Sequence, residues 1–233
     1  EDSERATYEK LSRVLGHEVN NTVAATGSVL DSLLYYSAQL TAQDSADFTT
    51  AIDAVRRRNA SLGDFIDRFT RVIRMPDPEL RPANVADIMD DILWLNREQC
   101  KTREISIGWE RRDEVPALRI DSQLMEQALL NIVKNAIEAV DSARQQTGAP
   151  GGSVKFSLVR EGDGARLSIA DSGDRLGEVP PRHLFTPFFT TKKGGQGIGL
   201  MFVREVLNRH GFAYRLASND GATRFDIWFP AAA

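Results

Sequence analysis

The sequence predicts two segments of different architecture: an antiparallel helical hairpin, then an α/β sandwich in which a helix layer covers one mixed sheet. Three observations carry this prediction. Residues 1–75 contain no proline, the stretch MPDPELRP then places prolines at positions 76, 78 and 82, and apolar residues change from helical spacing to alternation beyond it. Because proline does not continue a helix, we place one domain at residues 1–76 and the other at residues 77–233.

Two long helices account for the pattern of the first segment. In the second of them, spacings of four and three alternate in a heptad seam with one polar interruption, at Phe48, Ile52, Val55, Asn59, Leu62, Ile66, Phe69 and Ile73. The turn between the helices is predicted near residues 37–46, where Thr41 and Asp44 have the spacing of a capping box. Two helices alone bury too little apolar surface, so we expect the hairpin to dimerise into a four-helix bundle.

The second segment alternates strand and helix patterns. Apolar and polar residues alternate, as in half-buried strands, at 104–109, 153–160, 165–171, 212–218 and 223–229. Helical spacing occurs at 84–100, 121–145 and 197–210, where Asp121 is placed to cap the second helix and Gly211 to end the third. Interspersed strands and helices favour one sheet with helices packed on it.

Composition excludes several classes of protein. The net charge of −4 supplies no basic field for nucleic acid, and a single cysteine cannot form a disulfide framework. No apolar run reaches the roughly 18 residues of a membrane span, and the polar start, which lacks Met, leads us to expect a fragment or processed chain. His183 and His210 are interpreted as structural, since neither has metal-ligand spacing with the other or with Cys100.

The stretch LGHEVNN places a histidine inside the first helix. His17 follows Leu15 of the apolar face by two residues, which is about 200° around a helix, so we expect it to point away from the hairpin core. Glu18 adjoins it, and Asn21 lies one turn later on the same face. An exposed imidazole beside a carboxylate is a competent nucleophile, and a plain surface histidine is the alternative.

Two further stretches combine polar residues with apolar elements. In LLNIVKNAIEA, Asn131, Asn135 and Glu138 form a polar stripe on an apolar helix; amide oxygens suit Mg²⁺ beside phosphate, and a solvated helix face is the alternative. In IADSGD, Asp171 ends a strand just before a glycine turn at Gly173. Its carboxylate can accept a hydrogen bond from an adenine amine, and an ordinary Asx-turn is the alternative.

The stretch LFTPFFTTKKGGQGIGLMFVREVL indicates a phosphate-binding loop. Hydroxyls and cations precede alternating glycines that run directly into an amphipathic helix, and a helix N-terminus favours anions. The spacing is neither that of a P-loop nor that of a dinucleotide-binding fingerprint. It is the order of the asparagine helix, the strand-end aspartate, the phenylalanine-rich segment and the glycine loop that makes the pattern specific.

Over its whole length the chain resembles the catalytic core of a two-component sensor histidine kinase. HEVNN is similar to the H-box of the nitrogen-regulator-like subgroup, NIVKNAIEA to the N-box, DSG to the first glycine box, LFTPFF to the F-box and GQGIGL to the second glycine box. GATRFDIWFP is similar to the closing strand motif. The resemblance implies a dimerisation and phosphotransfer hairpin followed by the ATP-binding domain shared with gyrase, Hsp90 and MutL.

The resemblance also implies roles for individual residues. His17 would be the phosphoacceptor, Glu18 the general base, and Asn21 the residue that orients water for dephosphorylation of the partner. Asn135 would bind Mg²⁺. Contacts to ATP would come from Asn131, Asn135, Asp171, Gly173, Thr190, Thr191, Lys192, Gly195, Gly197, Gly199 and Leu200, and the lid base from Phe185, Phe188 and Phe189. Two positions depart from the pattern: Arg175 replaces the second glycine of its box, and Thr22 stands where a proline is usual.

By this resemblance the chain would autophosphorylate from ATP with Mg²⁺, act as a homodimer, and pass the phosphoryl group to an aspartate in the receiver domain of a response regulator. A nucleotide-impaired scaffold or phosphatase for a regulator is one alternative, and an ATPase of the same nucleotide fold is another. We expect a bacterial cytoplasmic location, either alone or as part of a longer sensor whose membrane contact lies outside this chain.

Overall fold

The computed structural model describes residues 2–148, 151–173, 185, 197–219 and 221–231, with side chains from Val19 onward except those of Gln43 and Asn219. The chain forms two compact units, Glu1–Pro76 and Asp77–Ala233. Within the described ranges, no helix is both long enough and apolar enough to cross a membrane.

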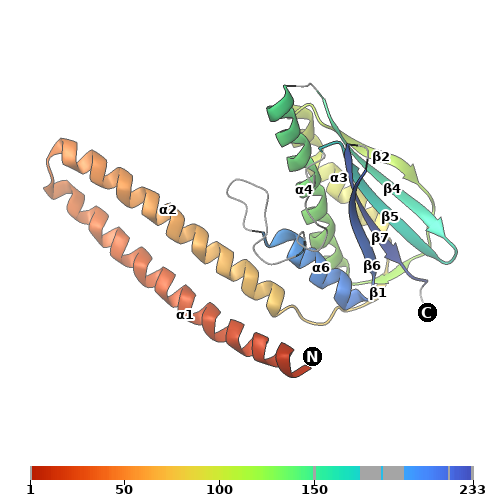
Figure 1. The fold of residues 1–233 in the computed structure, drawn as a ribbon, viewed down its shortest axis with the longest axis horizontal. Coiled ribbons are helices and arrows are strands. Elements are labelled where there is room, and N and C mark those ends of the chain that lie inside the picture. The colour runs from red at the N-terminus through yellow and green to blue at the C-terminus, as the bar shows by residue number, and fades with distance from the viewer. Residues whose placement is uncertain (1, 149–150, 174–184, 186–196, 220, 232–233) are drawn as a thin grey trace. The chain divides into compact units, whose positions relative to one another are not determined.

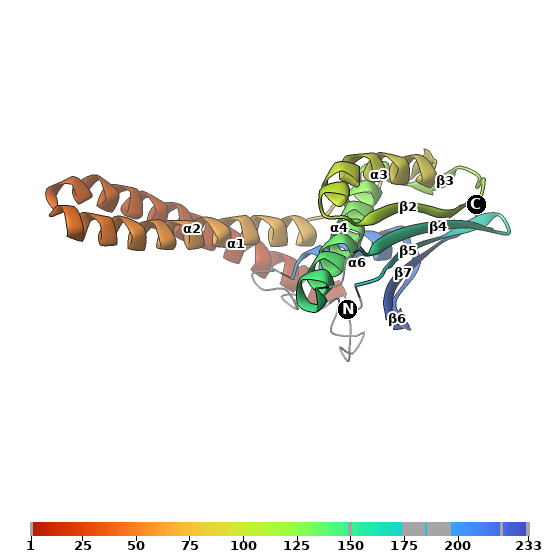
Figure 2. The same ribbon diagram turned by 90° about the horizontal axis from the view of Figure 1, so that it is seen from above.

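The first unit is a hairpin of two helices that run antiparallel and side by side (Figures 1 and 2). Helix α1 spans Asp2–Tyr35 and α2 spans Ala42–Ile73, with a short 3₁₀ turn, Tyr36–Gln39, between them. Thr41 caps α2: its hydroxyl accepts the Asp44 N–H at 3.3 Å and donates to the Asp44 carboxylate at 2.5 Å. The predicted turn and its cap are therefore confirmed.

The polar interruption in the seam of α2 makes a specific contact across the hairpin. Asn59 Nδ2 donates to the Val23 carbonyl oxygen of α1 at 2.8 Å. Near the other end, Asn20 Nδ2 donates to Asp67 Oδ1 at 2.8 Å. A side chain that bonds one particular carbonyl of the facing helix selects one register, as expected for a polar residue in a helical seam.

The second unit contains the mixed sheet that the alternation predicted. Its strand order is β2-β4-β5-β7-β6, with β2 parallel to β4 and every other neighbouring pair antiparallel. The strands are β2 Ser106–Arg112, β4 Ser153–Glu161, β5 Gly164–Asp171, β6 Ala213–Asn219 and β7 Ala222–Phe229. A separate antiparallel pair, β1 Arg81–Ala83 with β3 Leu118–Ile120, was not predicted, because three residues are too few to show alternation.

Three helices of this unit cover one face of the sheet (Figure 2). They are α3 Val85–Thr102, α4 Ser122–Thr147 and α6 Gly199–His210. Asp121 caps α4 by accepting the Gln123 and Leu124 N–H groups, each at 3.1 Å. Gly211, at φ +71°, ends α6 in the left-handed conformation that glycine favours. Both predicted helix boundaries are therefore confirmed.

The core of the second unit lies between these helices and the sheet. Its largest fully buried side chains come from both layers and from β3: Met89, Ile92, Leu118, Ile120, Met125, Leu129, Ile137, Phe156, Leu158, Leu167, Leu207 and Ile227. Alternate residues of the strands point into this core. The intervening residues, such as Arg166 and Ser168 on β5, point to the other face.

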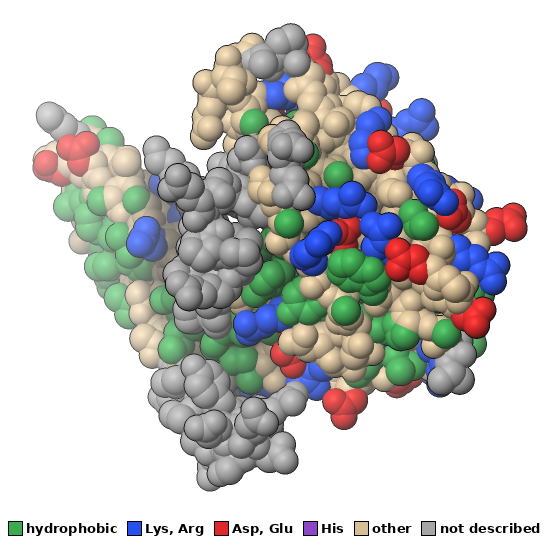
Figure 3. Space-filling view, turned by 45° about the vertical axis from the view of Figure 1, so that its right-hand side comes forward, with side chains coloured by type: hydrophobic (Ala, Val, Ile, Leu, Met, Phe, Trp, Pro, Cys, Tyr) green, Lys and Arg blue, Asp and Glu red, His purple; other side chains and the backbone are tan. Residues whose placement is uncertain are grey.

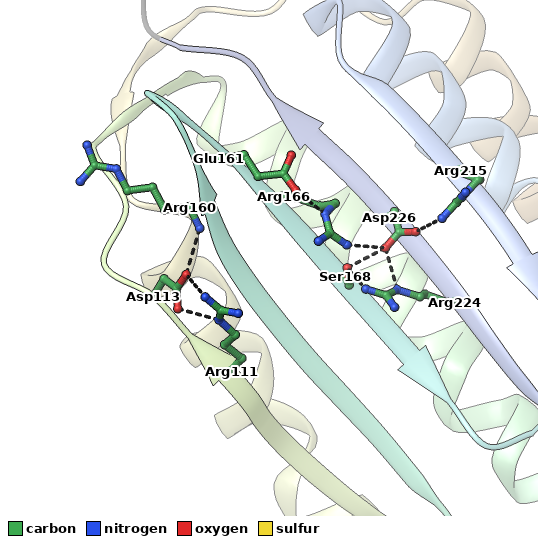
Figure 4. Close-up of polar contacts among 9 residues, drawn as sticks. All are labelled: Arg111, Asp113, Arg160, Glu161, Arg166, Ser168, Arg215, Arg224 and Asp226. Carbon is green, nitrogen blue, oxygen red and sulfur yellow. Dashed lines mark hydrogen bonds and ion pairs between the residues drawn. The ribbon is translucent and has the colours of Figure 1, made fainter.

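That other face of the sheet carries a polar network centred on Asp226 (Figure 4). Positively and negatively charged side chains lie next to one another on the surface of this unit (Figure 3). Asp226 is 1% exposed; its Oδ1 accepts from Ser168 Oγ at 2.6 Å and from Arg224 Nε at 2.8 Å, and its Oδ2 accepts from Arg215 at 3.1 Å. Burial alone would raise the pKa of the Asp226 carboxyl, but these hydrogen bonds outweigh burial and lower it. The ionised carboxylate therefore holds β5, β6 and β7 together.

Replacing Asp226 with Asn should destabilise the second unit by about 2–3 kcal/mol, because the arginines lose their shared anion and the buried position loses charge-assisted hydrogen bonds. Since the folded-state pKa of Asp226 is lowered, its contribution is complete above the unfolded pKa of about 4 and is lost as the pH falls through the folded value. Urea unfolding at neutral and acid pH measures both effects.

Asp113→Asn is the matched control on the same side of the sheet (Figure 4). Asp113 likewise accepts two hydrogen bonds from arginine, here both from Arg111 at 2.8 and 2.9 Å, but this pair lies nearer the solvent. Its loss should change the free energy of unfolding little. Equal effects of the two substitutions would contradict a special role for the buried carboxylate.

Candidate functional site

The two asparagines of the polar stripe lie beside the first residue of α6. Asn131 and Asn135 are one turn apart on α4, and both are half-buried. A Cβ atom added to Gly199 would lie 3.6 Å from Asn131 Oδ1 and 3.9 Å from Asn135 Nδ2. Segments more than sixty residues apart in sequence therefore bring two amide groups to the N-terminus of a helix.

The backbone at the start of α6 allows a ligand to approach closely. Gly197 has φ +67°, a conformation that favours glycine, and Ile198 is 6% exposed. Leu200, in the first turn, is half-buried. The N–H groups of a helix N-terminus and its dipole together favour an anion, so phosphate oxygens suit this end of α6.

Asp171 lies at the end of β5, and its carboxylate is buried, at 6% exposure. Its Oδ1 accepts the Gly173 N–H at 2.9 Å, which forms the Asx-turn that the sequence left as an alternative. An ionised carboxylate has about four acceptor positions, so this turn is compatible with a further bond to an adenine amine.

The glycine after this aspartate is required by packing. A Cβ atom on Gly173 would lie 2.5 Å from the Ala139 carbonyl carbon and 2.7 Å from the Val140 nitrogen, both in the backbone of α4. The turn therefore presses directly on α4, one turn beyond Asn135. This packing places Asp171 close to α4, the helix that carries Asn135.

Sequence reasoning missed the residues that hold the turn from its other side. Ser172 Oγ accepts the Ser153 N–H at 2.9 Å, and the Ser172 N–H donates to the Ser153 oxygen at 3.1 Å. Gly152, at φ +147°, would place a Cβ 2.3 Å from Val140 Cγ1. The adjacent Gly151–Gly152 pair was the signal for this close approach, but a glycine pair before a strand also fits an ordinary loop.

Phe185 packs against aromatic residues of the sheet. Its ring is 5.3 Å from that of Tyr214 on β6 and 6.2 Å from that of Phe225 on β7, both edge-on. Burial raises the pKa of the Tyr214 hydroxyl. Edge-to-face geometry is favourable for aromatic pairs, so these contacts hold Phe185 against β6 and β7.

Several predicted site residues lie outside the described part of the structure. These are Thr190, Thr191, Lys192 and Gly195 of the loop, together with Arg175, Phe188 and Phe189. His17 and Glu18 lie in α1, but their side chains are not among those described. Asn21, one turn after His17, is exposed.

The donor groups suit a nucleotide with a divalent cation. Amide oxygens are hard ligands for Mg²⁺, which usually keeps several waters and the substrate's phosphate oxygens in its shell. Among the described residues, no three His, Cys, Asp or Glu side chains gather as a metal site. Asn131 and Asn135 supply side-chain amide groups at this site, and amide oxygens suit such a cation.

Comparison with known proteins identifies the ATPase domain. The profile described as histidine kinase-, DNA gyrase B-, and HSP90-like ATPase matches residues 120–233. The nitrogen regulation protein NtrY of Azorhizobium caulinodans is 27% identical over 223 residues, which cover 96% of this chain and 28% of NtrY. Residues 120–233 belong to the histidine kinase-, DNA gyrase B-, and HSP90-like ATPase family. The sensory histidine kinase/phosphatase NtrB of Rhizobium leguminosarum bv. phaseoli is also 27% identical, over 95% of this chain and 58% of NtrB. This chain thus spans less than two thirds of either relative.

Solved structures share the fold over nearly the whole chain. Full-length ShkA in complex with AMPPNP matches with a TM-score of 0.67 and 22% identity, over 96% of this chain and 46% of ShkA. Histidine kinase ThkA in complex with response regulator protein TrrA matches with a TM-score of 0.65 and 19% identity, over 96% of this chain and 61% of that one. The resemblance stated from the motifs is confirmed.

Proposed function

We propose that this chain transfers the γ-phosphoryl group of ATP to His17 and then to an aspartate of a response regulator. The observation that carries the proposal is the grouping of Asn131, Asn135 and Gly199 at the start of α6, with the Asp171 turn packed on the same helix α4. Relatives that cover nearly all of the chain are named histidine kinases or nitrogen regulators.

In this proposal the nucleotide lies along α4. Asp171 accepts the adenine amine, and the N-terminus of α6, with Gly197 and Gly199, receives the phosphates. Thr190, Thr191, Lys192, Gly195 and Leu200 contribute the remaining loop contacts. Asn135, with Asn131 beside it, holds Mg²⁺, which offsets the charge of the phosphates when it is bound.

The transfer step uses the residues of α1. A ring nitrogen of His17 attacks the γ-phosphorus, the bond from that phosphorus to the bridging oxygen breaks, and ADP leaves with the electron pair. Glu18 accepts the proton of the other ring nitrogen, which makes the attacking nitrogen more nucleophilic. The phosphohistidine then passes its phosphoryl group to the regulator's aspartate.

We also propose that the hairpin forms a homodimeric four-helix bundle. Apolar side chains remain exposed along it: Val29 at 59%, Leu33 at 38%, Leu40 at 42%, Val55 at 49% and Leu62 at 45%. Such a row of exposed apolar groups on both helices suits a second copy of the same hairpin. We place this catalytic core in the bacterial cytoplasm, where ATP and response regulators occur.

Dephosphorylation of the regulator is a second candidate activity. Asn21 is exposed one turn from His17, where its amide can orient a water molecule towards an acyl phosphate docked on α1. The relative NtrB carries both activities in its name. Asn21 serves only this second reaction in the proposal.

The test is incubation of the purified chain with γ-labelled ATP and Mg²⁺, followed by acid and alkali treatment. We expect label that is lost in acid and kept in alkali, as phosphohistidine requires. Bound ATP without label would contradict the kinase proposal and favour the phosphatase. Absence of both label and ATP binding would contradict the nucleotide site itself.

A further inference from the structure

The C-terminal end of α6 binds the segment through which the chain enters the second unit. Arg209 is 12% exposed; its Nε contacts Glu205 Oε1 at 2.6 Å and its Nη1 contacts Asp77 Oδ1 at 3.1 Å. Asp77 is the first residue of that unit. One largely buried guanidinium therefore joins the last turn of α6 to the start of the unit.

The next residue, His210, makes a second connection. Its Nδ1 lies 2.7 Å from the Val206 carbonyl oxygen, which only accepts, so Nδ1 carries the proton and Nε2 accepts the Asp121 N–H at 3.1 Å. Burial lowers the pKa of His210, which keeps this neutral form. A buried imidazole thus joins the end of α6 to the cap of α4.

Asp121 completes the connection with its carboxylate. While Oδ1 caps α4, Oδ2 accepts the Glu79 N–H at 3.0 Å. Beyond Glu79 the chain forms β1, which pairs with β3, and β3 leads back to Asp121. We call Asp77, Glu79, Asp121, Arg209 and His210 the linker junction.

The two helices that meet at the linker junction are α4 and α6. Both also carry residues proposed to bind the nucleotide, and these residues lie some distance along each helix from the junction. Helix α6 begins at Gly199 and is twelve residues, or about 18 Å, long. Asn131 and Asn135 lie 10 and 14 residues after Asp121 on α4. The contact of Gly199 with these asparagines and the bond between His210 and Asp121 show that α4 and α6 run antiparallel.

We infer that Arg209 and His210 are positioning residues for the proposed phosphoryl transfer. They act through Asp77 and Asp121, and they hold the entry of the chain at a set distance from the N-terminus of α6 and the asparagines of α4, where the phosphates are proposed to bind. A bound nucleotide, by stabilising α4 and α6, also stabilises the linker junction. The inference rests on the proposed function for its catalytic consequence, while the junction itself is measurable without catalysis.

The test combines Arg209→Gln with Asp121→Asn. Asn is as good a helix cap as Asp, but its NH₂ group cannot accept the Glu79 N–H. Arg81→Gln is the control, because among the described residues the ion pair of Arg81 is with the exposed Glu79 side chain in the same segment. We expect faster hydrogen exchange at residues 77–84 in the double variant, and no change in the control.

The kinetic readout separates positioning from structure. At saturating ATP the labelling rate of His17 should fall about tenfold in the double variant, since small misplacements of reacting groups are costly. ATP affinity should change by no more than about threefold. The ion pair between Arg209 and Asp77, which is 99% exposed, is weak and therefore has little influence on nucleotide binding. Placing Lys instead of Gln at position 209 in the double variant should restore part of the labelling rate. A parallel loss of affinity and thermal stability, or an unchanged rate with faster exchange, would overturn the inference.

Failure of the proposed function would be visible separately. If the wild-type chain takes up no label, AMPPNP should still slow hydrogen exchange at residues 77–84 in the wild type and have a smaller effect in the double variant. Equal slowing in both chains, or none in either, would refute the coupling through the linker junction.

Discussion

A chain in which Gln replaces His17 should bind ATP like the wild type. Its rate of labelling from γ-labelled ATP should fall by more than about a thousandfold, as expected when a nucleophile is removed. Gln is a good helix former of similar size, so α1 should persist. Every residue that we assign to the nucleotide lies beyond position 120, in the other unit. Labelling with γ-labelled ATP, beside a nucleotide titration of the same sample, measures both properties.

The two other histidines provide the controls for this variant. The chain has three histidines in all, and His210 is 8% exposed with both ring nitrogens in contact with backbone groups. His183→Gln should label like the wild type. Acid-labile label that persists in His17→Gln and disappears in His183→Gln would move the phosphoacceptor to His183 and refute the proposed mechanism.

Local chemistry made much of the fold predictable. The cap at Thr41, the cap at Asp121 and the helix end at Gly211 each depend on a residue and its immediate neighbours, so the sequence alone indicates them. The long strands were predictable because one face of the sheet is buried and the other is polar. The short strands β1 and β3 were not, because their pairing depends on partners almost forty residues away.

The site was predictable in its residues and not in its contacts. The asparagine stripe on α4 and the glycines before α6 were recognisable from residue type and spacing, but neither pattern shows that Gly199 lies beside Asn131. Likewise, Asp226 appeared only as one alternating position of a strand. Its burial among arginines results from the order of β5, β7 and β6, which the alternation of a single strand does not contain.

Replacing Gly173 with Ala should reduce ATP affinity by about 10- to 100-fold. The new Cβ would lie within 2.8 Å of three atoms of Ala139 and Val140, two of them backbone, so the turn or helix α4 must move. Either movement displaces Asp171, whose carboxylate accepts the Gly173 N–H. Loss of the one charge-assisted bond that we propose between Asp171 and adenine accounts for this factor. Calorimetric titration with AMPPNP measures the change.

Gly108→Ala is the matched control for this substitution. Gly108 lies in β2, its Cβ would have no heavy atom within 4 Å, and its backbone needs no left-handed conformation. Alanine there should leave ATP affinity unchanged and stabilise the chain by about 0.4–1 kcal/mol through the unfolded state. Wild-type affinity in Gly173→Ala would show that the turn moves without carrying Asp171 away, and Asp171 would then not be the residue that reads adenine.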